Sequence, residues 1–584
     1  MKFLKSYQSK IGWLELRLRY VVKTLSPRAK IVFVAFSAVT LIGLLALLYK
    51  ADKSLAVEIP AQGGILKEGI VGTPRFINPI LAISDADRDL TALVYSGLMR
   101  VSENNQLAPD LAESYEISND GLCYTFTLKP NLKWSDGKPL NTDDVIFTID
   151  LIKNNQTKSP KRASWEGVLV EKLDEKKVQF CLQKIYAPFL ENTTIGIMPK
   201  HIWKDLPIEQ LSLSDFNIKP IGSGPYKIQS ISKNSSGITT SYTLNANKNF
   251  ALHQPYIETM ILKFYPSENK LIDGYKRNEI DSLSAVSPKN VADIKKEESV
   301  LKTYFLPRVF GVFFNQDNAK IFTDKEVKRA LDLGVDKELI IKEVLKGFGA
   351  ELNGPLPPTT REIVEEKEKN YEKNLAQAKN ILEKAGWKMN NEGTREKTTL
   401  TKNKKKETVK LEFSLSTSNV EELSQTAQLL KEMWGKLGAK VDVRVYEIGD
   451  LEQNVIRPRK YNALLFGESM ARDPDPFAFW HSSQRNDPGL NIALYTNISV
   501  DKILEDARAI FDQNKREEKY KQFQKEINKD AAAIFLYSPD FIYLLPNYVK
   551  SINGDRIVMP SDRFVNVHNW YIETKKTWKL SDNI

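Results

Sequence analysis

The sequence contains few of the residues that usually build metal centres and nucleophilic active sites. Its 584 residues include only two cysteines and four histidines. The histidines are scattered, and none lies in an H-E-x-x-H or nucleophile-elbow context; they are His201, His253, His481 and His568. The glycine-containing stretch "GSGPYK" lacks the spacing and the Ser/Thr of a phosphate-binding loop. We therefore expect a protein that is not an enzyme and that needs no metal or other cofactor.

The sequence also lacks a general basic surface, although its formal net charge is +10. The excess of Lys and Arg lies in residues 1–30 and 390–410, and the rest of the chain is close to neutral. Domains that bind nucleic acid carry a basic stripe across the folded body, so we exclude that partner. The lysine-rich stretch at 390–410 predicts an exposed hairpin or loop, and contact with anionic lipid or a wall polymer is the alternative.

One long hydrophobic run stands near the N-terminus. Residues 31–49 carry no charge, and a helix of that length spans roughly 28 Å, about the hydrocarbon thickness of a bilayer. The run ends without a small-residue cleavage pattern, and no cysteine lies near it to serve as a lipoprotein anchor. The basic residues before it predict a single-pass signal anchor, with residues 1–30 cytoplasmic and the main body extracytoplasmic. A long cleaved signal peptide is the alternative.

The two cysteines occupy equivalent places in two alternating segments. Cys123 lies in "GLCYTFTL" and Cys181 in "KVQFCLQK", and in each segment the cysteine faces away from its apolar neighbours. If the two strands are neighbours, the thiols share a sheet face. A disulfide and two reduced thiols both remain open at this point.

Beyond residue 60 the chain alternates strands and helices with no detectable repeat, which indicates α/β or α+β lobes. The alternating apolar pattern predicts strands at 64–71, 122–129, 177–183, 225–231, 239–245, 259–265, 309–315, 409–416, 440–446 and 461–467. The 3.6-residue pattern predicts helices at 85–99, 143–153, 325–333, 336–346, 374–386, 420–437, 500–512 and 515–530.

The adjacent acids Asp143 and Asp144 raise the question of a metal or proton-transfer site. They follow a turn, and Asn141 or Thr142 can cap a helix whose first turn they occupy, where acids face the positive end of the helix dipole. A metal site needs a third ligand at a set spacing, and none is evident. We predict that the pair opens a helix.

Several segments, in order, resemble the family 5 extracellular solute-binding proteins, the dipeptide- and oligopeptide-binding subunits of ABC importers. The resemblance runs from about residue 64 to residue 539. Its segments are "YTFTL", a "DGKP" turn, "DVIFT", "PIGSGPYKI", "NKNFALHQPYIETMILKFY", "FFNQDNAKIFTDKEVKRALDLGVDKELI", "ILEKAGW", "DPDPFAFW" and "YKQFQKEINKDAAAIFLYSP".

The resemblance implies an α/β, two-lobed periplasmic-binding-protein-like fold (type II, large peptide-binding class), here with an N-terminal transmembrane helix. The expected organisation is a cytoplasmic segment at 1–30, a transmembrane anchor at 31–49, a linker at 50–59, lobe I at 60–305 with an inserted subdomain at about 100–215, lobe II at 306–535, and a return to lobe I at 536–584. The implied function is to bind a peptide or similar ligand between the lobes and deliver it to the permease.

The resemblance also implies where a ligand binds. Family members commonly pair the amine of a peptide with an aspartate three positions before an acid–proline pair. Asp473-Pro474 is that pair here, and Met470 replaces the aspartate. Glu468 or Asp473 could substitute, and Met470 with Trp480 could favour an apolar ligand. The expected ligand-binding residues are Asn78, Tyr95, Asn315, Glu468, Met470, Arg472, Asp473 and Trp480.

Each of these residues also has a structural interpretation. Asn78 can shape a turn, Tyr95 and Trp480 can belong to the core, and Asn315 can cap a strand end. Arg472 and Asp473 can pair with each other. The implied partners are a small ligand, the transmembrane subunits of an ABC permease and the membrane itself, with the chain a monomer. A membrane-anchored sensor or surface-interaction protein that reuses the fold is the alternative function.

Overall fold

The structure is a computed structural model that describes residues 20, 23–294, 296–357, 370–400 and 406–578. The chain divides into two compact units, one of residues 1–61 with 573–584 and one of residues 62–572. Most of the basic segment at 1–30 lies outside the described residues, as does the tip of the lysine-rich stretch at 401–405.

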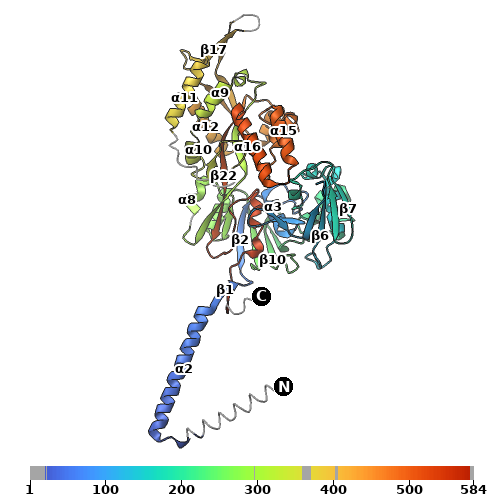
Figure 1. The fold of residues 1–584 in the computed structure, drawn as a ribbon, viewed down its shortest axis with the longest axis vertical. Coiled ribbons are helices and arrows are strands. Elements are labelled where there is room, and N and C mark those ends of the chain that lie inside the picture. Colours follow the sequence, from blue (N-terminus) through green and yellow to red (C-terminus); the bar gives the residue numbers. More distant parts are fainter. Residues whose placement is uncertain (1–19, 21–22, 295, 358–369, 401–405, 579–584) are drawn as a thin grey trace. The chain divides into compact units, whose positions relative to one another are not determined.

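The first unit joins the N-terminal helix to a two-stranded ribbon (Figure 1). Helix α2 (Pro27–Leu55) is followed directly by strand β1 (Ala56–Pro60), which pairs antiparallel with β23 (Thr574–Trp578). The sequence predicted a linker at 50–59, but the structure has the end of α2 and β1 there. The pairing of β1 with the C-terminal strand explains why this segment is ordered: its backbone groups are satisfied by a strand far away in sequence.

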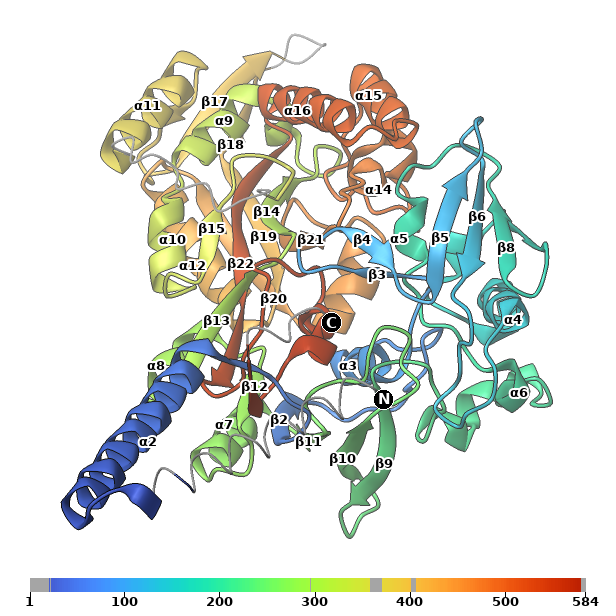
Figure 2. The same ribbon diagram turned by 60° about the horizontal axis from the view of Figure 1, so that its bottom comes forward.

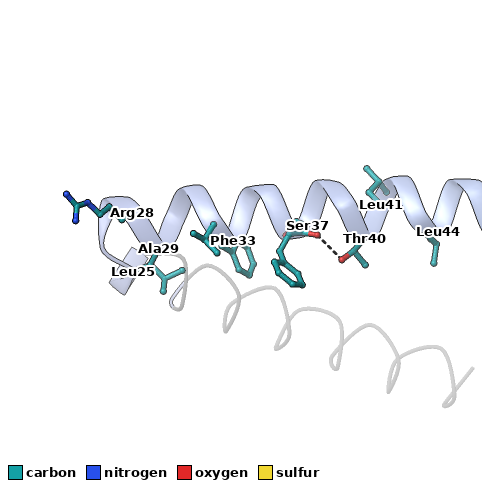
Figure 3. Close-up of a pocket in the computed structure, with 10 residues that line it drawn as sticks. Leu25, Arg28, Ala29, Phe33, Ser37, Thr40, Leu41 and Leu44 are labelled. Carbon is teal, nitrogen blue, oxygen red and sulfur yellow. Dashed lines mark hydrogen bonds between the residues drawn. The ribbon is translucent and has the colours of Figure 1, made fainter.

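Helix α2 is long and apolar enough to cross a membrane. Its apolar part, Pro27–Leu47, has a mean hydropathy of 2.3, and none of its most hydrophobic stretch is buried inside the structure. One polar group on it, the hydroxyl of Thr40, donates to the carbonyl oxygen of Phe36 at 2.8 Å (Figure 3), so its hydrogen bond is made within the helix. A hollow of about 970 Å³ lies along this apolar face, and in a bilayer acyl chains would cover such a surface.

The second unit is organised around one twelve-stranded mixed sheet. Its main path runs β20-β19-β21-β14-β22-β12-β2-β11-β10-β9, and β13 and β15 pair with β22 beside that path. The strands are β2 (Ile65–Val71), β9 (Tyr226–Lys233), β10 (Thr239–Ala246), β11 (Thr259–Tyr265), β12 (Ser282–Ser284), β13 (Ser299–Phe305), β14 (Arg308–Phe314), β15 (Gly349–Glu351), β19 (Glu412–Ser418), β20 (Lys440–Tyr446), β21 (Ala463–Ser469) and β22 (Ala533–Pro546).

Strand β22 runs through both halves of the sheet (Figure 2). Its residues up to Pro539 pair with β14 and β15, and its residues from Asp540 onward pair with β13 and β12. Beside it the chain crosses once more, from β13 to β14 through Leu306 and Pro307. The two crossings are linked because Ser538 Oγ donates to the carbonyl oxygen of Leu306 at 2.7 Å. We call the β2 side of these crossings lobe I and the β14 side lobe II.

The helices cover the sheet as an α/β fold requires. In lobe I they are α3 (Asp85–Val94), α7 (Glu268–Lys276) and α8 (Val291–Ile294). In lobe II they are α9 (Lys325–Leu333), α10 (Lys337–Glu343), α11 (Tyr371–Lys384), α12 (Glu421–Gly435), α14 (Phe477–Trp480), α15 (Ile498–Arg508) and α16 (Gln513–Asp530). Strand β14 is buried on both faces: Val312 and Phe314 point into one core of lobe II, and Val309 and Phe313 into the other.

An inserted subdomain has its own four-stranded sheet and its own core. Its elements are β5 (Ala112–Ile117), β6 (Cys123–Leu128), α4 (Thr142–Lys153), β7 (Leu169–Lys172), β8 (Lys177–Cys181), α5 (Phe189–Asn192) and α6 (Lys200–Trp203). The antiparallel register places Cys123 opposite Cys181, and the structure joins them in a disulfide with an S–S distance of 2.11 Å.

The structure confirms the helix predicted at the paired acids. Asn141 caps α4, because its side chain accepts from the backbone N–H of Asp143, and the carboxylate of Asp144 accepts from the backbone N–H of Asn141. This reciprocal pair is a capping box. Asp143 pairs with Lys172 at 3.1 Å, so both acids have structural partners.

Most predicted helices lie within a few residues of their expected bounds, but one is much shorter. The apolar spacing predicted a helix over 85–99, whereas α3 ends at Val94 and β3 (Met99–Val101) pairs with β4 (Leu107–Pro109). The helix stops because residues 95–98 pack against other segments: a Cβ at Gly97 would lie 2.6 Å from the carbonyl oxygen of Thr194. In the lysine-rich region, where the sequence predicted an exposed hairpin or loop, β16 (Lys388–Met389), β17 (Arg395–Leu400) and β18 (Lys406–Lys410) form a three-stranded antiparallel sheet.

Candidate functional site

The loop that follows β21, residues 470–476, brings lobe II into contact with lobe I and the inserted subdomain. Its sequence, "MARDPDP", is rich in charge and proline. The backbone N–H groups of Arg472 and Asp473 donate to the two carboxylate oxygens of Glu191, on α5, at 3.1 and 3.4 Å. This 470–476 loop is therefore one place where lobe II meets lobe I and the inserted subdomain through polar groups.

Arg472 reaches across to lobe I. Its Nη2 lies 2.9 Å from a carboxylate oxygen of Asp562, and its side chain is only 10% exposed. The same oxygen of Asp562 also accepts from the backbone N–H groups of Val558 and Met559. The sequence left open a pair between Arg472 and Asp473, but in the structure the two bind different partners.

The two aspartates of the loop are already paired with arginines of lobe II. Arg516 contacts Asp473 through Nε and Nη2, at 3.2 and 2.5 Å. Arg508 contacts Asp475 through Nε and Nη2, the shortest distance being 2.6 Å, and Tyr186 of the inserted subdomain donates to the same carboxylate at 3.3 Å. Two-point arginine–carboxylate contacts are strong and well oriented, so they hold the loop in a defined position.

Glu468 is a buried carboxyl group in apolar surroundings. It lies opposite Val309 in the sheet and is 4% exposed. Among the described residues neither of its carboxylate oxygens has a hydrogen-bond partner, and the same holds for Nε1 of Trp480. Burial raises the pKa of Glu468 well above its usual range, and the neighbouring indole of Trp480 opposes the shift. A carboxyl in this position favours its neutral form.

We expect Glu468→Gln to stabilise the protein increasingly as pH rises above about 4.5. The folded state holds the proton of Glu468 at pH values where the unfolded state has lost it, so wild-type stability falls as pH rises toward the folded pKa. Glutamine does not titrate and escapes this loss. Melting curves of both proteins at about pH 5 and pH 8 measure the difference. Glu452→Gln, at an exposed ion pair with Arg457, is the control. If the difference in melting temperature between Glu468→Gln and wild type does not change with pH, the interpretation is contradicted.

Met470 and Trp480 pack inside lobe II in this conformation. Met470 is 2% exposed and Trp480 is 0% exposed. The Trp480 ring lies within 6.3 Å of the rings of Phe313, Phe523 and Phe535. Contact of either residue with a ligand stays a prediction that would need a local rearrangement of lobe II.

Three further predicted residues form hydrogen bonds or pack in the core within a single lobe. Asn78 is fully buried; its Nδ2 donates to Asn217 and its Oδ1 accepts from the N–H of Ile80. Asn315 caps the end of β14 and donates to the carbonyl of Arg459. Tyr95 is 5% exposed within the lobe I core. Their contact with ligand also stays a prediction.

Sequence reasoning did not identify several residues that meet the loop. They share no local pattern and come from distant segments: Tyr186, Glu191, Arg508, Arg516 and Asp562. The acid–proline pair Asp473-Pro474 located the loop in the sequence but did not indicate these partners. In the part of the chain that the structure describes, no cluster of His, Cys, Asp and Glu could hold a metal ion.

Comparison with known proteins identifies the class. The sequence pattern of the bacterial extracellular solute-binding proteins, family 5 (middle), matches residues 106–490. The chain therefore belongs to this family of transporter-associated solute-binding proteins, and the fold is the two-lobed type II arrangement expected from the sequence.

Individual relatives cover most of the chain. The oligopeptide-binding protein AppA of Bacillus subtilis is 28% identical over 88% of this chain and 92% of its own length. Its solved structure, in complex with a nonapeptide, has a TM-score of 0.67. NikZ from Campylobacter jejuni, solved with Ni(L-His), is 28% identical, with a TM-score of 0.68 over 87% of this chain and 99% of its own. Relatives of equal similarity thus bind ligands of different chemistry.

Proposed function

We propose that this protein is a membrane-tethered, extracytoplasmic solute-binding protein of an ABC importer, which binds peptides or similar ligands between its lobes and passes them to the permease. It acts as a monomer and releases the ligand chemically unchanged. The observation that carries the proposal is the 470–476 loop, through which lobe II meets lobe I and the inserted subdomain in polar contacts.

The arrangement suits a protein that opens and closes on a ligand. In the part of the chain that the structure describes, two chain crossings join the lobes, at residues 305–308 and 538–540. Few crossing strands favour hinge motion, in which the φ/ψ change is taken up by a few residues. A ligand that touches both lobes favours the closed form by its differential affinity for it. The nonapeptide bound by AppA supports a peptide as the ligand class.

The membrane tether rests on α2 and the residues before it. A 29-residue helix without acids in its first turn follows a basic N-terminal segment, and the positive-inside rule then places the body outside. Strand β1 continues from this helix, so the tether leaves little free chain between the apolar span and the ribbon.

Calorimetry against pools of short peptides tests the proposal. We expect ligand-driven heat and a rise in melting temperature that grows with free ligand concentration. Purification with mild detergent should also recover the two permease subunits. Absence of binding to every pool, together with recovery of a signalling or wall partner, would contradict the proposal and favour a membrane-anchored sensor.

A further inference from the structure

The disulfide of the inserted subdomain lies at the end of two paired strands. Strand β6 begins at Cys123 and β8 ends at Cys181, and the two cysteines form the pair at the end of the β6–β8 ladder. The turn at residues 118–121 comes just before the first cysteine, and residues 182–187 follow the second. The disulfide therefore joins two segments that leave the sheet at the same end, and we call these two segments the clasp.

Both segments of the clasp reach lobe II at residues 509–512, the connection between α15 and α16. A Cβ at Gly121 would lie 2.7 Å from Cε2 of Phe511 and 3.7 Å from Cγ1 of Ile185. The Phe511 ring, which belongs to the connection, thus packs directly on the turn of the clasp and lies beside its second segment. It remains 42% exposed, so these contacts cover only part of the ring.

The second segment adds contacts of other kinds. The backbone N–H of Ala187 donates to the carbonyl oxygen of Arg508, the last residue of α15, at 2.9 Å. The guanidinium carbon of Arg508 lies 5.6 Å from the centroid of the Tyr186 ring, within the range of a cation–π attraction. These contacts join protein groups to protein groups, so they stabilise the meeting of lobe II with the subdomain independently of any contact with a ligand.

The lobe II side of this contact is held by its own hydrogen bonds. Nη1 of Arg516 donates to the carbonyl oxygens of Ile510 and Phe511. The clasp, in contrast, is made of segments whose cysteines are 58 residues apart in sequence. A covalent link between such segments limits how far they can move apart. The fit of the clasp to a preformed connection therefore depends on the disulfide.

We propose that the Cys123–Cys181 disulfide is a positioning element for ligand binding. It holds the clasp in the form that receives the α15–α16 connection, and so favours the arrangement in which lobe II meets the inserted subdomain. The inference rests on the proposed function, because a ligand held between the lobes binds more tightly when the binding-competent arrangement is more populated. The disulfide acts through the clasp and Phe511, without touching the ligand.

Hydrogen exchange of the full chain in mild detergent, followed by mass spectrometry, measures the clasp without a ligand. Phe511→Ala should speed exchange in the segment that contains the Ala187 amide by about fivefold, because its hydrogen bond to lobe II opens more often. Phe216→Ala is the matched control, since Phe216 is similarly exposed, at 39%, and packs on Trp203 within the subdomain. Exchange in β6 and β8 should stay slow in every variant, which shows that the subdomain is folded.

Gly121→Ala tests the same contact from the side of the clasp. Gly121 has a φ of +72°, so alanine strains the turn there and also displaces the Phe511 ring. Gly137→Ala is its control, because Gly137 has a φ of +89° but no atom of the described residues lies within 4 Å of an added Cβ. Gly121→Ala should speed exchange of the Ala187 segment and weaken ligand binding, whereas Gly137→Ala should do neither.

Calorimetry with the pools of short peptides connects the disulfide to ligand binding. Phe511→Ala should weaken binding by about fivefold, and Cys123→Ser combined with Cys181→Ser by about threefold. All three substitutions together should weaken it by no more than about fivefold, because the cysteines act through the contact that Phe511→Ala already removes. Exchange of the Ala187 segment should follow the same pattern. A disulfide that only stabilised the subdomain would lower the melting temperature, and the two losses would multiply to about fifteenfold.

The outcomes separate this inference from the proposed function. If peptides bind, the inference is overturned when Phe511→Ala leaves exchange of the Ala187 segment unchanged, when affinity does not fall with it, or when the losses multiply; peptide binding then stands. If no peptide binds but exchange responds to Phe511 and the cysteines in the expected pattern, the clasp is supported and the proposed function is contradicted. If no peptide binds and exchange does not respond, both are overturned.

Discussion

Replacing Arg563 with methionine is expected to destabilise the protein by about 3–5 kcal/mol, the usual cost of removing one partner from a buried ion pair. Its side chain is 0% exposed. Nη1 and Nη2 bind the two oxygens of Asp89, at 2.8 and 2.6 Å, and Nε and Nη2 bind Glu68, at 2.9 and 2.7 Å. Without the guanidinium, two carboxylates would remain buried without a cation.

This network connects four elements of lobe I. Glu68 lies on β2, Asp89 on α3, Arg563 near the C-terminus, and Tyr543 on β22 donates to Glu68 at 2.6 Å. Two acids share one arginine, so the network keeps an excess negative charge, and burial raises the pKa of Asp89 to about 6 despite the arginine. The folded state therefore binds this proton more tightly than the unfolded state, and the contribution of Asp89 to stability falls as pH rises from about 4 to about 6.

Urea unfolding and melting of the detergent-solubilised chain measure the effect. Adding Glu68→Gln and Asp89→Asn to Arg563→Met should recover a large part of the loss, because no unpaired charge then remains buried. Arg444→Met serves as the surface control and should lie within about 0.5 kcal/mol of wild type. A similar near-neutral result for Arg563→Met would show that the buried network does not form.

Gly222→Ala is expected to cost about 3 kcal/mol or more, because the added methyl group meets backbone rather than a flexible side chain. A Cβ at Gly222 would lie 2.0 Å from the carbonyl oxygen of Val94, at the end of α3. At Gly224, the next glycine of the "GSGPY" motif, a Cβ would lie 2.5 Å from the carbonyl carbon of the same residue. The motif thus brings the segment before β9 against α3, and Gly224 N–H donates to Val94 at 2.8 Å.

Gly435→Ala is the matched control. Gly435 ends α12, and no atom lies within 4 Å of an added Cβ. The same chemical change there should be neutral or stabilising by up to about 1 kcal/mol, because alanine favours a helix. Thermal melting of the two variants side by side checks the contrast. Equal melting temperatures would contradict the close approach at Gly222.

Local sequence patterns predicted most of the helices and strands, because the residues that determine these elements lie within the elements themselves. The capping residues and apolar stripe of α4 lie within the helix itself, and the cysteine-bearing segments alternate over a few residues each. The long strand β22 was not predicted as one element, since its residues are buried on nearly every position and show no alternation. The position of β22 depends on its pairing partners in both lobes, and the sequence pattern of one segment does not identify those partners.

The contacts of the candidate site were less predictable because they, too, join segments that are distant in sequence. The "DPDP" motif located the loop, but the partners of its charges lie from 33 to 289 residues away in sequence, as for Arg508 and Tyr186, which both bind Asp475. Met470 and Trp480 are residue types that occur both on ligand-contacting surfaces and in hydrophobic cores. In the structure both pack in the core of lobe II among side chains of β14 and α16, and their contact with a ligand stays a prediction.

Native mass spectrometry of the full chain, extracted in mild detergent and never refolded, tests the central claim most directly. The account predicts a complex heavier than the polypeptide by one small peptide-like ligand, which is released intact on unfolding. Recovery of the bare polypeptide alone, with no mass shift after incubation with the pools of short peptides, would contradict a protein that encloses its ligand between two lobes.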